Sequence, residues 1–259
     1  MAIVSKGFMH QFWQAVEGGA YAKAEELNMD ANFVGPETES QVAKQIELLQ
    51  AEYDKSPQAV CFAALDSVAA TPLLEQMDAD GIPVISYDSG VESEIPISSA
   101  ATDKVAAAGL AAEMILELVG VGAQVGVFVH DQTSRTVIDR TEGFISKADE
   151  LGLEIVCPQF GGGDHAKSAD LAKAMMQANP DMAGFFAGNE GSAIGTLLAV
   201  DELDMAGDIV VIGYDSGKAQ IDAIKDGSMA GAVQQNPVGI GAWCVEAAAM
   251  ALQGEEVPD

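Results

Sequence analysis

The chain has 259 residues, of which 49% are hydrophobic and 20% are charged, a composition typical of a globular protein and not of a disordered one. Its formal net charge of −28 argues against nucleic acids and anionic membrane surfaces as partners, because their phosphates would be repelled. No apolar run reaches the roughly 18 residues that suggest a membrane span, and the length fits one large domain or two medium ones.

Short apolar runs rich in β-forming residues alternate along the chain with longer runs of helical apolar spacing. In chain order, strands are expected at residues 2–5, 31–35, 59–65, 82–87, 94–100, 124–130, 153–160, 183–188, 209–214 and 230–235. Helices are expected between them, for example at residues 12–27, 40–53, 68–77, 105–119, 136–151 and 168–178. This alternation predicts βαβ units and parallel sheets with helices on both faces.

One phrase occurs twice: VISYDSG at residues 84–90 returns as VIGYDSG at residues 211–217. A single sheet of all the expected strands would be large, and the repetition favours two smaller sheets. The sequence therefore predicts an α/β fold of two Rossmann-like lobes with parallel sheets. Each copy ends a strand, where open α/β sheets bind their ligands, so Asp88 and Asp215 are expected at the ligand edges. The alternative is that YDSG only shapes a turn after a buried strand.

Motifs for catalysis or for a resident cofactor fail on spacing or context. The glycines of GVGAQVG (120–126) have the wrong spacing for a dinucleotide site and follow a helix, and Glu190 stands where a GxSxG elbow needs glycine. The loop GGGDH (161–165) is interpreted as flexible, with Asp164 a plausible N-cap. Cys61, Cys157 and Cys244 match no metal motif and are expected to be buried thiols. No metal, no cofactor and no enzyme activity are predicted.

The remaining polar groups suit the binding of a neutral polar molecule. Asp88, Asn189, Asp215 and Gln235 each follow an expected strand, and their side chains exchange hydrogen bonds with hydroxyls. The adjacent Phe12 and Trp13 open the first helix, where an aromatic face can pack against the apolar side of a sugar ring. Trp13 alone is equally consistent with a place in the core.

Several phrases, in this order and spacing, make the whole chain resemble the ribose-binding-like periplasmic binding proteins, the solute receptors of ABC-type sugar importers. They are QFWQAVEGGA, GIPVISYDSG, SSAATD, RTEGF, AGNEGSAIG, VIGYDSG and VQQNPVGIG. The resemblance implies the type I architecture of that class, with a ligand cleft between two lobes that closes about hinges on a monosaccharide or cyclic polyol. It implies an N-terminal lobe of residues 1–102 plus 236–259, a C-terminal lobe of residues 103–235, and hinges near residues 101–104 and 235–237.

The resemblance also assigns ligand-binding positions to this chain. The candidates it implies are His10, Phe12, Trp13 and Asp88 in the first lobe, and Asn189, Asp215 and Gln235 in the second. Three positions depart from the ribose binders: Ser89 replaces an arginine, Gly163 a stacking phenylalanine and Ile138 a second-lobe arginine. Arg135, one helical turn before Ile138, is the candidate to replace that guanidinium. Lys6 either reaches the ligand or pairs with Asp66 or Asp88.

The resemblance implies partners and a location as well. The partners are a sugar or polyol and the membrane permease of an ABC importer, with a chemotaxis sensor compatible, and the chain is expected to be a monomer. MAIVSKGF has neither the basic region nor the apolar region of a signal peptide, and taken alone it indicates the cytoplasm. The resemblance implies instead export to the periplasm or lipid anchoring outside the cell. The alternative function is the effector domain of a lac-repressor-type regulator, which the net charge of −28 opposes.

Overall fold

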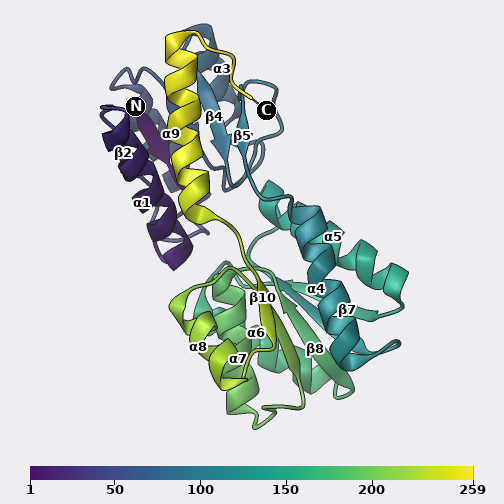
Figure 1. Cartoon of the computed structure of the whole chain (residues 1–259). Helices are drawn as coiled ribbons and strands as arrows, with labels where there is room; N and C mark the ends of the chain where they lie inside the picture. Colours follow the sequence, from purple (N-terminus) through teal and green to yellow (C-terminus); the bar gives the residue numbers. More distant parts are fainter. Residues whose placement is uncertain (259) are drawn as a thin grey trace. The chain divides into compact units, whose positions relative to one another are not determined.

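A computed structural model describes residues 1–258, with the side chain of Cys157 excepted. The chain divides into two compact units (Figure 1). Unit 1 comprises residues 1–102, 133–136 and 236–259, and unit 2 comprises residues 103–132 and 137–235.

Unit 1 is built on a parallel five-stranded sheet in the order β2-β1-β3-β4-β5. Its strands are β1 (Ala2–Val4), β2 (Asn32–Val34), β3 (Val60–Phe62), β4 (Val84–Tyr87) and β5 (Ser99–Ala100). Its helices are α1 (Gln11–Glu26), α2 (Val42–Tyr53), α3 (Thr71–Ala79) and α9 (Pro237–Gln253). The buried residues of α1 and α9 share one core cluster with the sheet, and those of α2 and α3 share the other, so helices cover both faces.

Helices α1 and α9 approach closely because glycine occupies their crossing. A side chain at Gly19 would collide with the carbonyl of Val238, and one at Gly241 would collide with the carbonyl of Val16. The last helix of the chain is thereby fixed against the first one.

Unit 2 is built on a second parallel five-stranded sheet, in the order β10-β9-β8-β6-β7. Its strands are β6 (Gln124–Val129), β7 (Glu154–Phe160), β8 (Met182–Ala187), β9 (Val210–Tyr214) and β10 (Gly231–Val233). Its helices are α4 (Lys104–Val119), α5 (Arg135–Leu151, in unit 2 from Val137 on), α6 (His165–Ala178), α7 (Glu190–Glu202) and α8 (Lys218–Asp226). Again two core clusters, one with α4 and α5 and one with α6, α7 and α8, cover the two faces.

The predicted alternation and the two parallel sheets are confirmed. The strand expected at residues 94–100 is shortened to β5, Ser99–Ala100. Pro96 lacks the backbone N–H that a ladder needs, and this explains the late start of the strand. Gly81, with φ 73°, follows the end of α3, where glycine commonly adopts the left-handed conformation that ends a helix.

The prediction that the cysteines are free buried thiols is wrong for two of them. Cys61 on β3 and Cys244 on α9 form a disulfide, with their Cα atoms 6.1 Å apart and both residues fully buried. Composition and spacing could not reveal this pair, because the packing of α9 on the sheet brings together residues separated by 183 positions. The side chain of Cys157 lies outside the described residues.

Candidate ligand-binding site

The two repeated aspartates share an uncommon backbone conformation. Asp88 follows β4 with φ 51°, and Asp215 follows β9 with φ 75°. Asp is one of the few residues besides glycine that adopt this left-handed region readily, because its short side chain bonds locally. The repeated YDSG therefore forms a left-handed turn at the carboxyl end of each strand. Both side chains are buried at that edge, so the turn also sets the position of each carboxylate.

In unit 1, the loop after β1 and the first turn of α1 hold four of the candidate residues. Lys6 and His10 are almost completely buried, at 1% and 3% exposure. Trp13 is 1% exposed and lies edge-on to two rings, with its centroid 5.0 Å from that of Phe12 and 6.2 Å from that of Tyr87. Trp13 is thus part of the core cluster that α1 and α9 form with the sheet.

Glu39, from the loop between β2 and α2, completes this group and was not selected from the sequence. Its Oε1 accepts a hydrogen bond of 2.7 Å from the indole Nε1 of Trp13 and lies 3.6 Å from Nδ1 of His10. No motif surrounds Glu39, and only the fold brings it to α1. The ETES stretch around it is indistinguishable in sequence from a solvated acidic loop.

Asp88 and Ser89 are held by the backbone on both sides of β4. The N–H of Asp88 donates to the carbonyl of Ala100 (2.9 Å), and the carbonyl of Ser89 accepts from the N–H of Ala64 (2.9 Å). The Oγ of Ser89 is fully buried and has no hydrogen-bond partner among the described residues. Burial, and secondarily the carboxylate of Asp88, holds the pKa of the Tyr87 phenol well above its usual range, so this ring stays neutral.

In unit 2, Asp215 is hydrogen-bonded to Gln235 and to the backbone of Glu190, the residue that follows Asn189. Oδ1 of Asp215 accepts from Nε2 of Gln235 (2.7 Å), and Oδ2 accepts from the backbone N–H of Glu190 (3.2 Å). Asn189 caps α7, because its Oδ1 accepts from the N–H of Ser192 (2.8 Å). The amide Nδ2 of Asn189 is buried and has no partner among the described residues. An unsatisfied buried donor of this kind costs about 1–3 kcal/mol, which a ligand acceptor would recover.

Sheet register identifies a further polar residue at this edge. Phe128 of β6 pairs with Ala187 of β8, so two residues later the same register sets His130 beside Asn189. Gly188 confirms the register, because its N–H donates to the carbonyl of Phe128 (2.7 Å). His130 is 2% exposed and its Nε2 lies 3.3 Å from Oδ2 of Asp131. His130 follows an apolar strand that the sequence predicts, but no other histidine lies near it in the sequence, so it matched no motif.

The guanidinium of Arg140 contacts the strand ends that carry the second-lobe candidates. Arg135 is exposed at the first position of α5, and Ile138 is half-buried. Arg140 is 3% exposed, donates from Nη1 to the carbonyl of Gly188 (2.6 Å) and lies 3.6 Å above the ring of Tyr214. It therefore contacts the residues that immediately precede Asn189 and Asp215. Arg140 is the first residue of RTEGF, one of the phrases that carry the family resemblance, but it was not selected as a site residue from the sequence.

The glycine-rich loop before α6 packs tightly and does not hold a stacking ring. A side chain at Gly191 would collide with the carbonyl of Gly163, so α7 rests directly on this loop. Asp164 is the N-cap of α6, as predicted, and accepts from the N–H of Lys167 (2.7 Å).

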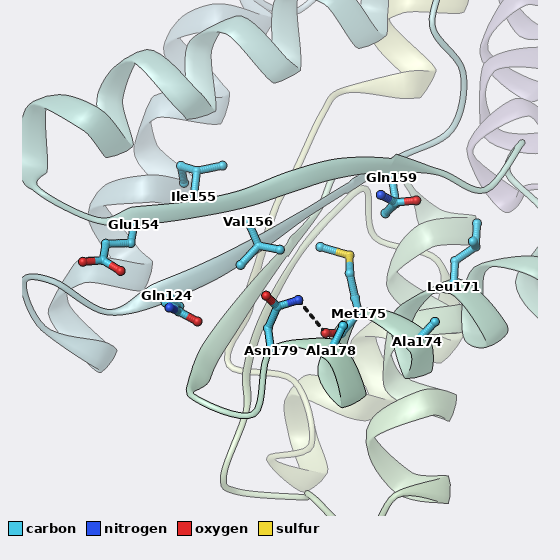
Figure 2. A pocket seen from close by; sticks show the side chains of 10 residues that line it. All are labelled: Gln124, Glu154, Ile155, Val156, Gln159, Leu171, Ala174, Met175, Ala178 and Asn179. Carbon is cyan, nitrogen blue, oxygen red and sulfur yellow. Dashed lines mark hydrogen bonds between the residues drawn. The ribbon is translucent and has the colours of Figure 1, made fainter.

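A cavity of about 550 Å³ in unit 2 lies apart from the candidate residues. Strand β7 and helix α6 line it, with Val156 and Met175 among the apolar groups and Gln124 and Asn179 among the polar ones (Figure 2). Asn179 donates to the carbonyl of Met175 (2.8 Å), so its amide serves the end of α6. None of the candidate ligand residues lines this cavity.

Two further features of the described residues concern metal ions and membranes. In residues 1–258, no group of three or more His, Cys, Asp or Glu side chains is arranged to hold a metal ion. No helix in the same range combines the length and the apolar character that crossing a bilayer requires.

Comparison with known proteins decides the family. The sequence profile described as "Periplasmic binding protein domain" matches residues 1–256. The chain belongs to this family. The resemblance seen in the sequence is thereby confirmed, and so is the type I fold with its two parallel sheets.

Named relatives of this periplasmic binding protein come from several bacteria. It is 27% identical to a D-ribose/D-allose-binding protein of Pseudomonas aeruginosa, over 98% of this chain and 82% of that protein. It is 28% identical to a ribose import binding protein of Bacillus subtilis, over 95% of this chain and 79% of that protein. Among solved structures, an ABC transporter solute-binding protein of Agrobacterium vitis with bound D-fucose superposes with a TM-score of 0.97 at 28% identity, covering 100% of this chain and 91% of that one.

Proposed function

We propose that this periplasmic binding protein is the extracytoplasmic receptor of an ABC importer and that its ligand is a monosaccharide or a cyclic polyol. The observation that carries the proposal is the buried Nδ2 of Asn189, a donor without a partner among the described residues, at the strand edge that also carries Asp215. A donor amide beside an acceptor carboxylate matches a ring hydroxyl, which both donates and accepts.

The other strand edge supplies complementary groups. In unit 1 the carboxylate of Asp88 and the unpartnered Oγ of Ser89 follow β4, and Phe12 and Trp13 open α1. We propose that a single ligand is bound by the carboxyl edges of both sheets. The ligand-contacting set proposed is Lys6, His10, Phe12, Trp13, Asp88, Ser89, Arg135, Asn189, Asp215 and Gln235, with Arg140 and His130 added from the structure.

The relatives support the class of ligand. Their names specify ribose and allose, and the Agrobacterium vitis protein holds D-fucose. All three are neutral monosaccharides. Hydrogen-bonding side chains at the two strand edges are suited to the hydroxyls of such molecules.

A location outside the cytoplasm is supported by the Cys61–Cys244 disulfide, because such bonds persist in oxidising compartments and are rare in the cytosol. The proposal includes the periplasm, or lipid anchoring at the outer face of a cell, and delivery of the ligand to a membrane permease. A monomer carrying one ligand fits this role.

Native mass spectrometry of the purified protein against a panel of pentoses, hexoses, deoxysugars and cyclic polyols tests the proposal. The expected result is a complex of one protein with one ligand for at least one member of the panel, at micromolar concentration. A protein that binds no member of the panel, including ribose, allose and fucose, contradicts the proposal.

A further inference from the structure

Glu39 is buried, at 7% exposure, beside the first turn of α1, whereas Glu37, the other acidic residue of its loop, is exposed. A buried carboxylate is costly unless it is paired with hydrogen-bond donors or positive charge. The indole N–H of Trp13 donates to Oε1 of Glu39 at 2.7 Å, and Nδ1 of His10 lies 3.6 Å from the same oxygen. Both partners are candidate ligand residues, so the contacts of Glu39 are directed at the binding edge.

Helix α1 gives a second reason for a carboxylate at this place. Its first turn contains no acidic residue, and its N-cap, His10, makes no side-chain capping bond. The amino end of a helix carries partial positive charge and favours a negative group nearby. Glu39 brings a carboxylate from a neighbouring loop to the side chains of His10 and Trp13 at this end of the helix.

The contacts of Trp13 extend this restraint to the ligand edge. Its ring packs edge-on against Phe12 on one side and against Tyr87 on the other, with interplanar angles of 88° and 81°. Tyr87 is fully buried and immediately precedes Asp88. Rotation of the indole would therefore disturb both the aromatic residue that opens α1 and the strand end that carries the first aspartate.

We infer that Glu39 is a positioning residue of the ligand site: it fixes the indole of Trp13 and thereby the geometry of Phe12 and Asp88. The inference rests on the proposed function, because it concerns the binding of the same monosaccharide. Glu39 acts through Trp13 and needs no contact with the ligand.

The test compares Glu39→Gln with Glu39→Met. Both side chains have about the length of glutamate, but only glutamine keeps an oxygen that accepts the indole hydrogen bond. Glu52→Gln and Glu52→Met are the matched controls. Glu52 is also a buried glutamate of unit 1, at 5% exposure, but it accepts from Asn32 at the amino end of β2.

Sugar affinity is measured by calorimetric titration with the ligand identified by mass spectrometry. Glu39→Gln should bind within about threefold of the wild type and Glu39→Met about tenfold more weakly, since one neutral hydrogen bond corresponds to about a decade of affinity. The Glu52 pair should show no such difference. In a Trp243→Phe background, Trp13 is the sole tryptophan, and its indole N–H resonance should move in Glu39→Met and remain close to that of the wild type in Glu39→Gln.

Outcomes separate the two hypotheses. A wild type that binds no sugar overturns the proposed function and this inference with it. A wild type that binds, together with folded Glu39→Gln and Glu39→Met proteins of equal affinity, overturns the inference alone. An unmoved indole resonance in Glu39→Met also overturns it, because the hydrogen bond would then not hold Trp13.

Discussion

Replacement of Asp215 should weaken ligand binding and also destabilise the ligand-free protein. In the folded chain its carboxylate already accepts two hydrogen bonds, from Gln235 (2.7 Å) and from the N–H of Glu190 (3.2 Å). Asn keeps one carbonyl oxygen and tolerates φ 75°, so Asp215→Asn loses one of these bonds and the charge. The unfolding free energy of the ligand-free protein should fall by about 1–3 kcal/mol.

Asp215→Ala should be more severe. It removes both bonds and places a Cβ-bearing residue without a local hydrogen bond at φ 75°, which adds about 1–2 kcal/mol. Loss of a charge-assisted hydrogen bond to a sugar hydroxyl is worth about 1.5–3 kcal/mol, so both variants should bind about 10- to 100-fold more weakly.

Denaturant unfolding without ligand and calorimetric titration with ligand measure the two effects. Asp204 is the matched control for the backbone, since it also has a positive φ, 55°, but is exposed at the end of α7. Asp204→Ala should reproduce the conformational cost and leave affinity unchanged. The reasoning fails if Asp215→Asn retains wild-type affinity, because the aspartate would then only shape the turn. It also fails if Asp215→Ala is as stable as Asp215→Asn.

Three other outcomes are expected. Reduction of the Cys61–Cys244 disulfide, or replacement of both cysteines by alanine, should lower the unfolding free energy by about 2–5 kcal/mol. The reason is that the bond joins residues 183 positions apart. Equal denaturant midpoints with and without reductant would contradict this prediction. Arg140→Met should lower the unfolding free energy by about 2–4 kcal/mol, because the guanidinium donates to the carbonyl of Gly188 and lies over the ring of Tyr214. Arg140→Lys should give a value between those of the wild type and Arg140→Met. A loss below about 0.5 kcal/mol in Arg140→Met would refute the assigned contacts. Asn189→Ser keeps an oxygen that can cap α7 but removes the amide donor Nδ2. The unfolding free energy should therefore change by less than about 0.5 kcal/mol, while the affinity for the ligand falls about tenfold. Unchanged affinity would show that Nδ2 does not contact the ligand.

The secondary structure and the two sheets could be predicted because their signals are local. The alternation of apolar strands with helices is found in the structure, although several bounds differ. The helix expected at residues 68–77 lies at Thr71–Ala79, and the strand expected at residues 59–65 is confined to Val60–Phe62. The repeated YDSG phrase also carried local information, because a left-handed turn restricts which residues can occupy it.

What the sequence could not supply depends on side chains that meet through tertiary packing. The Cys61–Cys244 pair requires α9 to lie on the first sheet, and Glu39 reaches Trp13 only because the loop after β2 lies beside α1. Arg140 was present in a phrase that supported the resemblance, but its burial against Tyr214 depends on tertiary packing and not on the phrase itself. These residues break no local pattern, so only the fold identifies them.

The central claim is that one monosaccharide is bound by groups from both strand edges. Calorimetric titration of the identified sugar into the wild type, Asp88→Asn and Asp215→Asn tests it most directly, because these two aspartates end β4 of unit 1 and β9 of unit 2. The account predicts one ligand per chain in the wild type and an affinity loss of about 10- to 100-fold in each variant. Two ligands per chain, or a loss in only one of the two variants, would contradict it.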